Sequence, residues 1–156
     1  MPLPLGIVID MSASSPVFPR SAYDAVGGLV YFARMLDKIR LQADGRLGPE
    51  YHAFLGEGFD GRLCRFLGVE YSQVRDRTLA GGTDEEILVW CLEMGHRRSE
   101  EEIHCWSKYA GKLGWRDEDT GATGRLAQNK AANGLAHRED LVTFFDFYEV
   151  DEKRRP

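Results

Sequence analysis

The chain has 156 residues, of which 43% are hydrophobic and 29% charged, and its formal net charge is −5. This length and balance are typical of one globular domain with a substantial core. Acidic and basic residues are interleaved, which argues against proteins that bind nucleic acid or anionic membranes, because both classes need a basic patch. A site for a small anion stays open, because it needs only local positive charge.

The sequence predicts a cytoplasmic protein that needs no cofactor and no metal. No stretch approaches the roughly 18 apolar residues of a membrane span. The start of the chain has no basic leader and too short an apolar run for a signal peptide. Cys64, Cys91 and Cys105 are odd in number and far apart, so small buried thiols in a reducing compartment fit them better than disulfides or a metal site.

Residues 1–18 indicate an extended arm, because the first 20 residues hold four of the six prolines and a serine-rich run. Met11 is an alternative native start. The arm could also join two copies of the chain as a homodimer. The single helical domain is expected over residues 19–150, followed by a solvated tail over residues 151–156.

The segment from Gly28 to Arg40 predicts the body of the longest helix, with Ser21 as its N-cap and Gly45 as its C-terminal cap. Gly27 and Gly28 lower helix propensity, so they indicate a bend, a close approach of another backbone, or a helix that starts after them. At about 100° per residue, one broad arc of this helix is apolar: Ala25, Val26, Leu29, Phe32, Ala33, Leu36, Ile39 and Ala43.

Arg40 falls near the middle of this apolar arc, and Asp37 lies at its margin, three residues from both Arg34 and Arg40. Arginine is rarely buried without a partner. We expect Arg40 either to extend past the core into water, or to form an internal ion pair with Asp37 or a later carboxylate. The alternative is that Arg40 lines a pocket for an anionic or carbonyl-bearing ligand and is held there by Asp37.

Helical periodicity and helix caps continue to the end of the chain. Residues 46–58 form a predicted loop that is rich in glycine and aromatic residues. Thr83–Glu86 fits a capping box for a helix that is expected to be buried nearly all round, and Ser99–Glu102 repeats the device. The expected later helices cover residues 60–67, 71–79, 84–94, 99–113, 125–133 and 138–148. The predicted fold class is all-α, a single-domain irregular bundle of about six to seven helices.

Residues 56–61 match the pattern G-x-G-x-x-G of dinucleotide-binding proteins. That pattern requires a preceding strand and a βαβ unit, whereas helices are expected on both sides here. Asp60, at the predicted N-cap of the next helix, would also repel a phosphate. We therefore reject a nucleotide site.

Several short motifs occur in a specific order along the chain. They are Pro19–Ser21, Gly27–Tyr31, Met35–Lys38, Gly58–Asp60, Phe66–Val69 and Asp146–Glu152. Together they resemble a bacterial family of unknown function, domain-of-unknown-function family 5069, over about residues 19–154. The resemblance implies a small cytosolic bacterial domain that stands alone. It implies no catalytic residue, because no activity is known for the family.

Motifs for metal binding and nucleophilic catalysis are missing. The four histidines, at positions 52, 96, 104 and 137, lack the i, i+4 spacing of a helical metal pair, and no His/Cys cluster has zinc-finger spacing. No G-x-S-x-G or other nucleophile signature occurs.

The remaining polar and aromatic residues define the candidate site. Arg62 lies two residues beyond the predicted N-cap Asp60, where the helix dipole disfavours a cation, so it should pair with Asp60, Asp37 or a ligand. The set is either an ion-pair network between the first helix and the glycine-rich loop, or a ligand site. Its members are Tyr31, Arg34, Asp37, Arg40, His52, Asp60, Arg62 and Trp106.

Two functions fit these residues. The first is a binding module without chemistry of its own, centred on Arg40 and Asp37, for a small anionic metabolite or a partner protein. The second is a small enzyme that uses His52 or an aspartate as general base beside Arg40. A concave, water-accessible space around Arg40, Asp37 and His52 would favour the enzyme or the small ligand.

Overall fold

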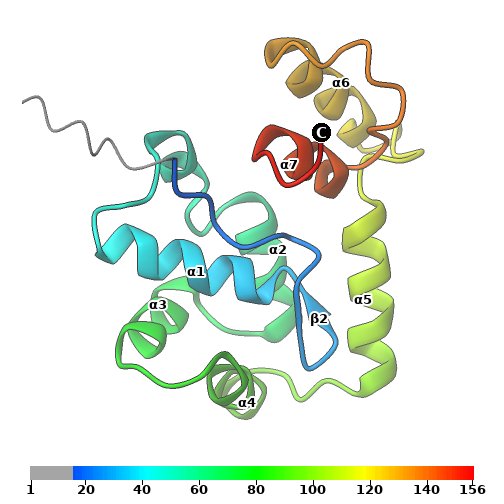
Figure 1. Ribbon diagram of the computed structural model, residues 1–156. Helices are drawn as coiled ribbons and strands as arrows, with labels where there is room; N and C mark the ends of the chain where they lie inside the picture. The colour runs from blue at the N-terminus through cyan, green and yellow to red at the C-terminus, as the bar shows by residue number, and fades with distance from the viewer. Residues whose placement is uncertain (1–15) are drawn as a thin grey trace, which may run out of the picture.

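Figure 1 shows the computed structural model of the protein, which describes residues 16–156. This part of the chain forms seven α-helices, one 3-10 helix and one two-stranded hairpin, which confirms the predicted all-α fold. No helix in it is long and apolar enough to cross a membrane. The elements in chain order are β1 (Ala25–Val26), β2 (Leu29–Val30), α1 (Phe32–Ala43), η1 (Pro49–Phe54), α2 (Gly58–Leu67), α3 (Tyr71–Leu79), α4 (Asp84–Met94), α5 (Glu100–Lys112), α6 (Ala122–Ala132) and α7 (Phe144–Asp151).

Helix α1 crosses the middle of the molecule, with α3 and α4 below it in the view of Figure 1. Helix α5 stands along the right-hand side of this view and packs against the hairpin, which lies between α1 and α5. The C-terminal helix α7 packs against the upper end of α5 and against α6. Within residues 16–156, the first helix and the last helix therefore belong to one packed body.

Helix α1 is buried on nearly all sides, a role that the sequence assigned to α4. Its buried residues include Phe32, Met35, Leu36 and Ile39, but also Arg34 and Lys38 on the opposite side of the helix. In α4, by contrast, only Ile87, Leu88 and Cys91 are buried, whereas Val89 and Met94 are 53% and 62% exposed. The prediction for α4 was wrong because apolar residues on its outer side were counted as core.

The predicted long helix over residues 21–44 is wrong in its first part, up to Tyr31. Ala25–Val26 and Leu29–Val30 pair as antiparallel strands, and Gly27 and Gly28 form the tip, with φ of 54° and 81°. This left-handed backbone suits glycine, which lacks a Cβ atom. Ser107 of α5 holds the hairpin, because its hydroxyl accepts from the amide of Val30 and donates to the carbonyl of Gly28. Of the three predicted alternatives, a helix that begins after the glycine pair is confirmed. The prediction that this helix is the longest is wrong, because α5 is longer than α1 by one residue.

Among the predicted helix starts, the two marked by a capping box are accurate. Helix α3 matches its predicted range, and the capping box of Thr83 and Glu86 begins α4 as expected. Ser99 caps α5 through the amide of Glu102. The last helix is shifted, because Thr143 accepts from the amide of Asp146 and fixes the start of α7 at Phe144 rather than at residue 138.

The two ends of the chain differ from their predictions in different ways. Most of the predicted arm, residues 1–15, lies outside the described residues, and so does the proposed homodimer contact through it. The predicted solvated tail is wrong at Glu152, which is 3% exposed, because the backbone after α7 turns its side chain toward α1.

Candidate functional site

The side of α1 opposite Phe32 carries two buried cations. The first is Arg34, whose two terminal nitrogens each donate to one carboxylate oxygen of Glu152 at 2.7 Å. Both side chains are at most 4% exposed. This fork-to-fork geometry is the strongest that arginine forms with a carboxylate, and it joins residues 118 positions apart.

Other groups complete the environment of Glu152. The Tyr51 hydroxyl donates to its Oε2 at 2.6 Å, and the Arg154 guanidinium donates to its Oε1. The Arg34 guanidinium also lies 4.8 Å from the centre of the Tyr148 ring, within cation–π range. Burial alone would raise the pKa of Glu152, but the hydrogen bonds and charge of Arg34 outweigh it and lower that pKa below its ordinary value. The pair therefore stays ionised.

The second buried cation is Lys38, one turn after Arg34. Its Nζ donates to Oδ1 of Asp60 at 2.9 Å, and the Tyr31 hydroxyl donates to the same oxygen at 2.8 Å. The amide of Gly56 donates to Oδ2 at 3.0 Å. Burial lowers the pKa of Lys38, an effect that the charge of Asp60 opposes, and it raises the pKa of Tyr31 well above its ordinary value.

Tyr31 adopts a backbone conformation that is unusual for a residue other than glycine. Its φ is 70°, in the left-handed region, and it stands directly before the first residue of α1. Such a conformation costs on the order of 1–3 kcal/mol and persists only where the surroundings enforce it. Here the hydroxyl bond to Asp60 and the packing of the ring on Phe59 and Phe145 provide that enforcement.

We call these two neighbouring centres, Arg34–Glu152 and Lys38–Asp60, the buried ionic network, although no hydrogen bond joins them directly. Among the described residues, no buried side-chain nitrogen or oxygen lacks a hydrogen-bond partner. Burial also raises the pKa of Cys64 and of Cys91 to about 12, so neither thiol is a nucleophile at neutral pH. Cys105, predicted to be buried, is exposed on α5. The network thus resembles the predicted ion-pair alternative more than a ligand site.

Three predicted site residues, Asp37, Arg40 and His52, have separate partners. Arg40 bonds Asp84 at 2.7 Å with 36% of its side chain exposed, so its partner is a later carboxylate, as one predicted alternative has it, and the predicted pair with Asp37 is wrong. Asp37 instead accepts from the backbone amide of Arg20. His52 contacts the carbonyl of Leu47 through Nε2. The error at Arg40 follows from the misplaced helix, because residues 25–29 of the hairpin were included in the apolar arc.

Arg62 and Trp106, the remaining predicted residues, lie together where α2 meets α5. Arg62 donates to the hydroxyl of Tyr109 at 3.1 Å, and Trp106 stacks on Phe66 with ring centres 5.4 Å apart. Arg98 lies over the Phe66 ring at 4.8 Å and donates to the Phe66 carbonyl. We call these residues, all of which are at least partly exposed, the arginine–aromatic face: Arg62, Phe66, Arg98, Trp106 and Tyr109.

The predicted reason for Arg62 needs correction. Glu57, not Asp60, is the N-cap of α2, and Asp60 lies within the first turn. Arg62 therefore stands beyond the turn where the helix dipole disfavours a cation. In the described residues no carboxylate oxygen lies within 4.0 Å of Arg62, whereas Arg34, Arg40 and Arg98 all have such partners.

Sequence reasoning missed important members of both groups. Among the missed residues, Lys38 was the easiest to predict from the sequence, because it lies one turn from Arg34 on the same side of α1. Glu152 and Tyr51 reach that side only through the tertiary fold, and no local spacing connects them to it. Phe66 and Tyr109 were assigned only to apolar helix faces, although each lies one turn or less from a residue that was selected.

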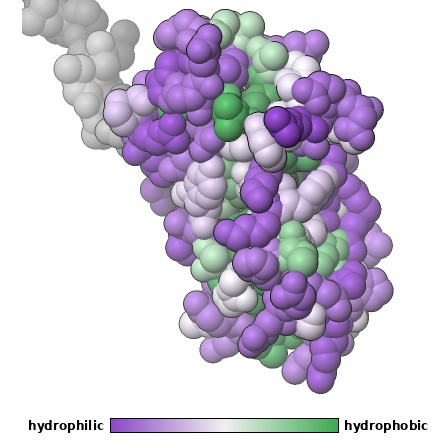
Figure 2. Space-filling model, turned by 90° about the vertical axis from the view of Figure 1, so that its right-hand side faces the viewer, coloured by the Kyte–Doolittle hydropathy of each residue, from purple (hydrophilic) through white to green (hydrophobic). Residues whose placement is uncertain are grey.

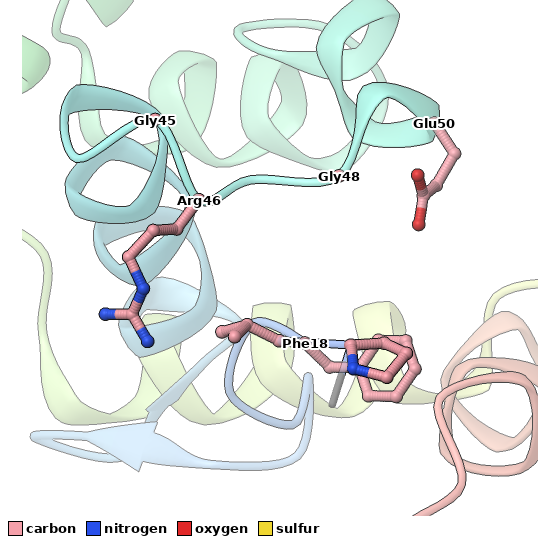
Figure 3. A pocket seen from close by; sticks show the side chains of 7 residues that line it. Phe18, Gly45, Arg46, Gly48 and Glu50 are labelled. Carbon is pink, nitrogen blue, oxygen red and sulfur yellow. The ribbon is translucent and has the colours of Figure 1, made fainter. Parts of the chain in front are cut away.

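Two hollows on the surface of the described residues are shallow rather than enclosed. One has a volume of about 450 Å³ and lies between residues 16–18 and the segment 45–50; Figure 3 shows Arg46 and Glu50 on either side of it and Phe18 below. The other, of about 510 Å³, lies between the hairpin tip and the start of α5, beside Glu100, Glu101 and His104. Both are open to solvent, unlike typical small-molecule sites.

No group of three or more His, Cys, Asp or Glu side chains within residues 16–156 is placed to hold a metal ion.

A search among curated proteins gives no significant match to the chain. One family model, described as a domain of unknown function (DUF5069), matches residues 17–154. This range covers every helix and strand of the structure, the buried ionic network and the arginine–aromatic face. The chain therefore belongs to the DUF5069 family.

Proposed function

We propose that this protein is a binding module without chemistry of its own, and that it holds a segment of a partner protein on the arginine–aromatic face. The observation that carries the proposal is the gathering of three aromatic rings and two guanidinium groups on one partly exposed surface, joined by one ring stack, one cation–π contact and one hydrogen bond. Trp, Tyr and Arg are the residue types that dominate the energy of protein interfaces. The surface is also held in place before binding, which lowers the cost of ordering side chains.

The surroundings of this face support a local docking surface. Figure 2 looks onto the side of the molecule where α5 lies, and hydrophobic residues there form separate small patches among polar ones. Tyr109 is 47% exposed and Trp106 is partly exposed, so both rings can gain buried area when a partner binds. Such small patches suit a short segment better than a large permanent interface.

The enzyme alternative has less support. A general base has to reach a substrate, yet the aspartate with the richest environment, Asp60, is fully buried and accepts three hydrogen bonds. His52 and Arg40 bond different parts of the chain. We therefore centre the binding module on Arg62 and Trp106 rather than on Arg40 and Asp37. We place it in the cytoplasm, where Cys64 and Cys91 would remain reduced.

The test is a selection of short random peptides displayed on phage against the immobilised protein. Peptides that bind the face should lose about thirtyfold in affinity when Trp106 or Tyr109 is replaced by alanine, as interface hot spots do. Val89→Ala is the matched control, since Val89 is an exposed apolar residue on α4, away from the face. Circular dichroism and melting temperature show whether each variant is folded. Binders that are indifferent to both Trp106→Ala and Tyr109→Ala would refute the proposal.

A further inference from the structure

We propose that the segment bound by the arginine–aromatic face is acidic: a stretch of a partner protein that places a carboxylate beside an apolar side chain. This inference rests on the proposed function and specifies the chemistry of the partner. It starts from Arg62. The guanidinium of Arg62 has five N–H groups, and one of them donates to the Tyr109 hydroxyl at 3.1 Å.

Arg62 is the open cation of the face. In the described part of the chain no carboxylate lies within 4.0 Å of it, whereas Arg98 bonds Glu102 at 3.1 Å and also the Phe66 carbonyl. A guanidinium that keeps most of its donors toward solvent matches a carboxylate in two-point geometry. The bond to Tyr109 fixes its position, so little side-chain freedom would be lost on binding.

The charge around the Tyr109 end of the face has the same sign. Lys112 lies three residues after Tyr109, on the same side of α5, and is exposed. Arg62 and Lys112 therefore give this end of the face a local positive charge. This local charge would attract an acidic segment and favour the orientation in which its carboxylate meets Arg62.

The aromatic rings determine what must accompany the carboxylate. Phe66 and Trp106 stack at an interplanar angle of 22°, and Arg98 lies over Phe66, so the rings present a preformed apolar surface beside Arg62. A carboxylate alone would leave these rings in water. A segment with an apolar residue next to its acidic residue would cover the rings and reach Arg62 together.

The experiment uses the full chain and peptides from the phage selection, made synthetically with a fluorescent label. Fluorescence anisotropy gives the Kd of each peptide and of its copy with Asp and Glu replaced by Gln or Asn. We expect Arg62→Gln to weaken the acidic peptide at least tenfold, as the loss of a charge-assisted hydrogen bond does. The same variant should leave the neutral copy unchanged, and higher salt should weaken only the acidic peptide. Arg75→Gln on α3 is the control, because Arg75 is a surface arginine, 50% exposed, that pairs with the exposed Asp76.

The outcomes separate this inference from the proposed function. Acidic peptides that depend on both Arg62 and Tyr109 support it. Some selected peptides could depend on Trp106 or Tyr109 and yet be neutral or basic, or bind equally well to Arg62→Gln. Such peptides would overturn the acidic partner but would still support the binding module. Peptides that depend on none of these residues overturn both. Arg62 and Tyr109 are at least partly exposed, so Arg62→Gln and Tyr109→Ala keep the test valid even if Trp106→Ala does not fold.

Discussion

The buried pair of Arg34 and Glu152 allows a quantitative test of how the two ends of the domain are held together. Replacing Glu152 by leucine would strand the Arg34 charge at a site where only 4% of its side chain is exposed. It would also take an acceptor from Tyr51 and Arg154. Loss of one partner from a buried ion pair costs about 3–5 kcal/mol. We expect Glu152→Leu to reach the upper end of this range.

Replacing Arg34 by methionine should cost less, about 3 kcal/mol. The Glu152 carboxylate would keep two donors, the Tyr51 hydroxyl and the Arg154 guanidinium. In the reverse case the Arg34 guanidinium keeps only the carbonyl of Arg20 as a hydrogen-bond partner among the described residues. The double variant should recover part of the loss, with a coupling energy of about 1–3 kcal/mol.

Urea unfolding at neutral pH, followed by circular dichroism, measures these free energies. Arg75→Met is the control, because Arg75 and Asp76 are 50% and 71% exposed and such pairs contribute about 0–1 kcal/mol. An unchanged m-value would show that the compactness of the unfolded state is the same. The reasoning is refuted if Glu152→Leu stays within about 1 kcal/mol of the wild type, or if the two single losses simply add.

Four further outcomes follow from the same structure. Because the pKa of Glu152 is lowered in the folded state, its contribution to stability is complete above about pH 4.3, the ordinary pKa of a glutamate. This contribution is lost as the pH falls through the folded pKa. Between about pH 5 and pH 3, the free energy of unfolding should therefore decline more steeply for the wild type than for Glu152→Gln. Phe144→Ala should cost about 3–5 kcal/mol in thermal or urea unfolding, whereas the partly buried Trp90 should cost less when truncated, and equal losses would contradict the packing. Tyr31→Phe removes the hydroxyl from Asp60 and should cost about 1–3 kcal/mol by urea unfolding, while Tyr23→Phe, on an exposed hydroxyl, should cost less. Gly95→Ala should cost about 3 kcal/mol because the new Cβ would lie 2.0 Å from the Leu67 carbonyl, whereas Gly111→Ala, with open space inside α5, should raise the melting temperature.

The accuracy of the sequence predictions depended on how local the determining interaction is. Thr83 and Glu86 bond each other's backbone within one turn, so the start of α4 was predicted correctly. The hairpin at Gly27–Gly28 was missed because its flanking apolar residues also fit a helical period. Only the pairing of Val26 with Leu29 and the bonds to Ser107, which is 77 residues from Val30, distinguish the two structures.

The same limit applies to the candidate site. Tyr31, Arg34 and Asp60 were selected from the sequence and lie in the buried ionic network, but their partners Glu152 and Lys38 were not selected. The side of α1 that holds Arg34 and Lys38 resembles the solvent-exposed side of an ordinary amphipathic helix, because a buried cation and an exposed one have the same sequence pattern. The pairing of Arg34 with Glu152 spans 118 residues and can be recognised only in the folded chain.

The position of Glu152 has a consequence for the order in which the protein can fold during synthesis. Helix α1 is translated well before the carboxylate that neutralises its buried Arg34, which follows 118 residues later, and Arg154 then bonds the carbonyl of Pro19. Until those residues leave the ribosome, burying α1 would place an unpaired charge in the core, so a native core is unfavourable on the nascent chain. The domain should therefore fold only after Glu152 has been synthesised, and a chain that stops before Glu152 would be a target for chaperones and proteases.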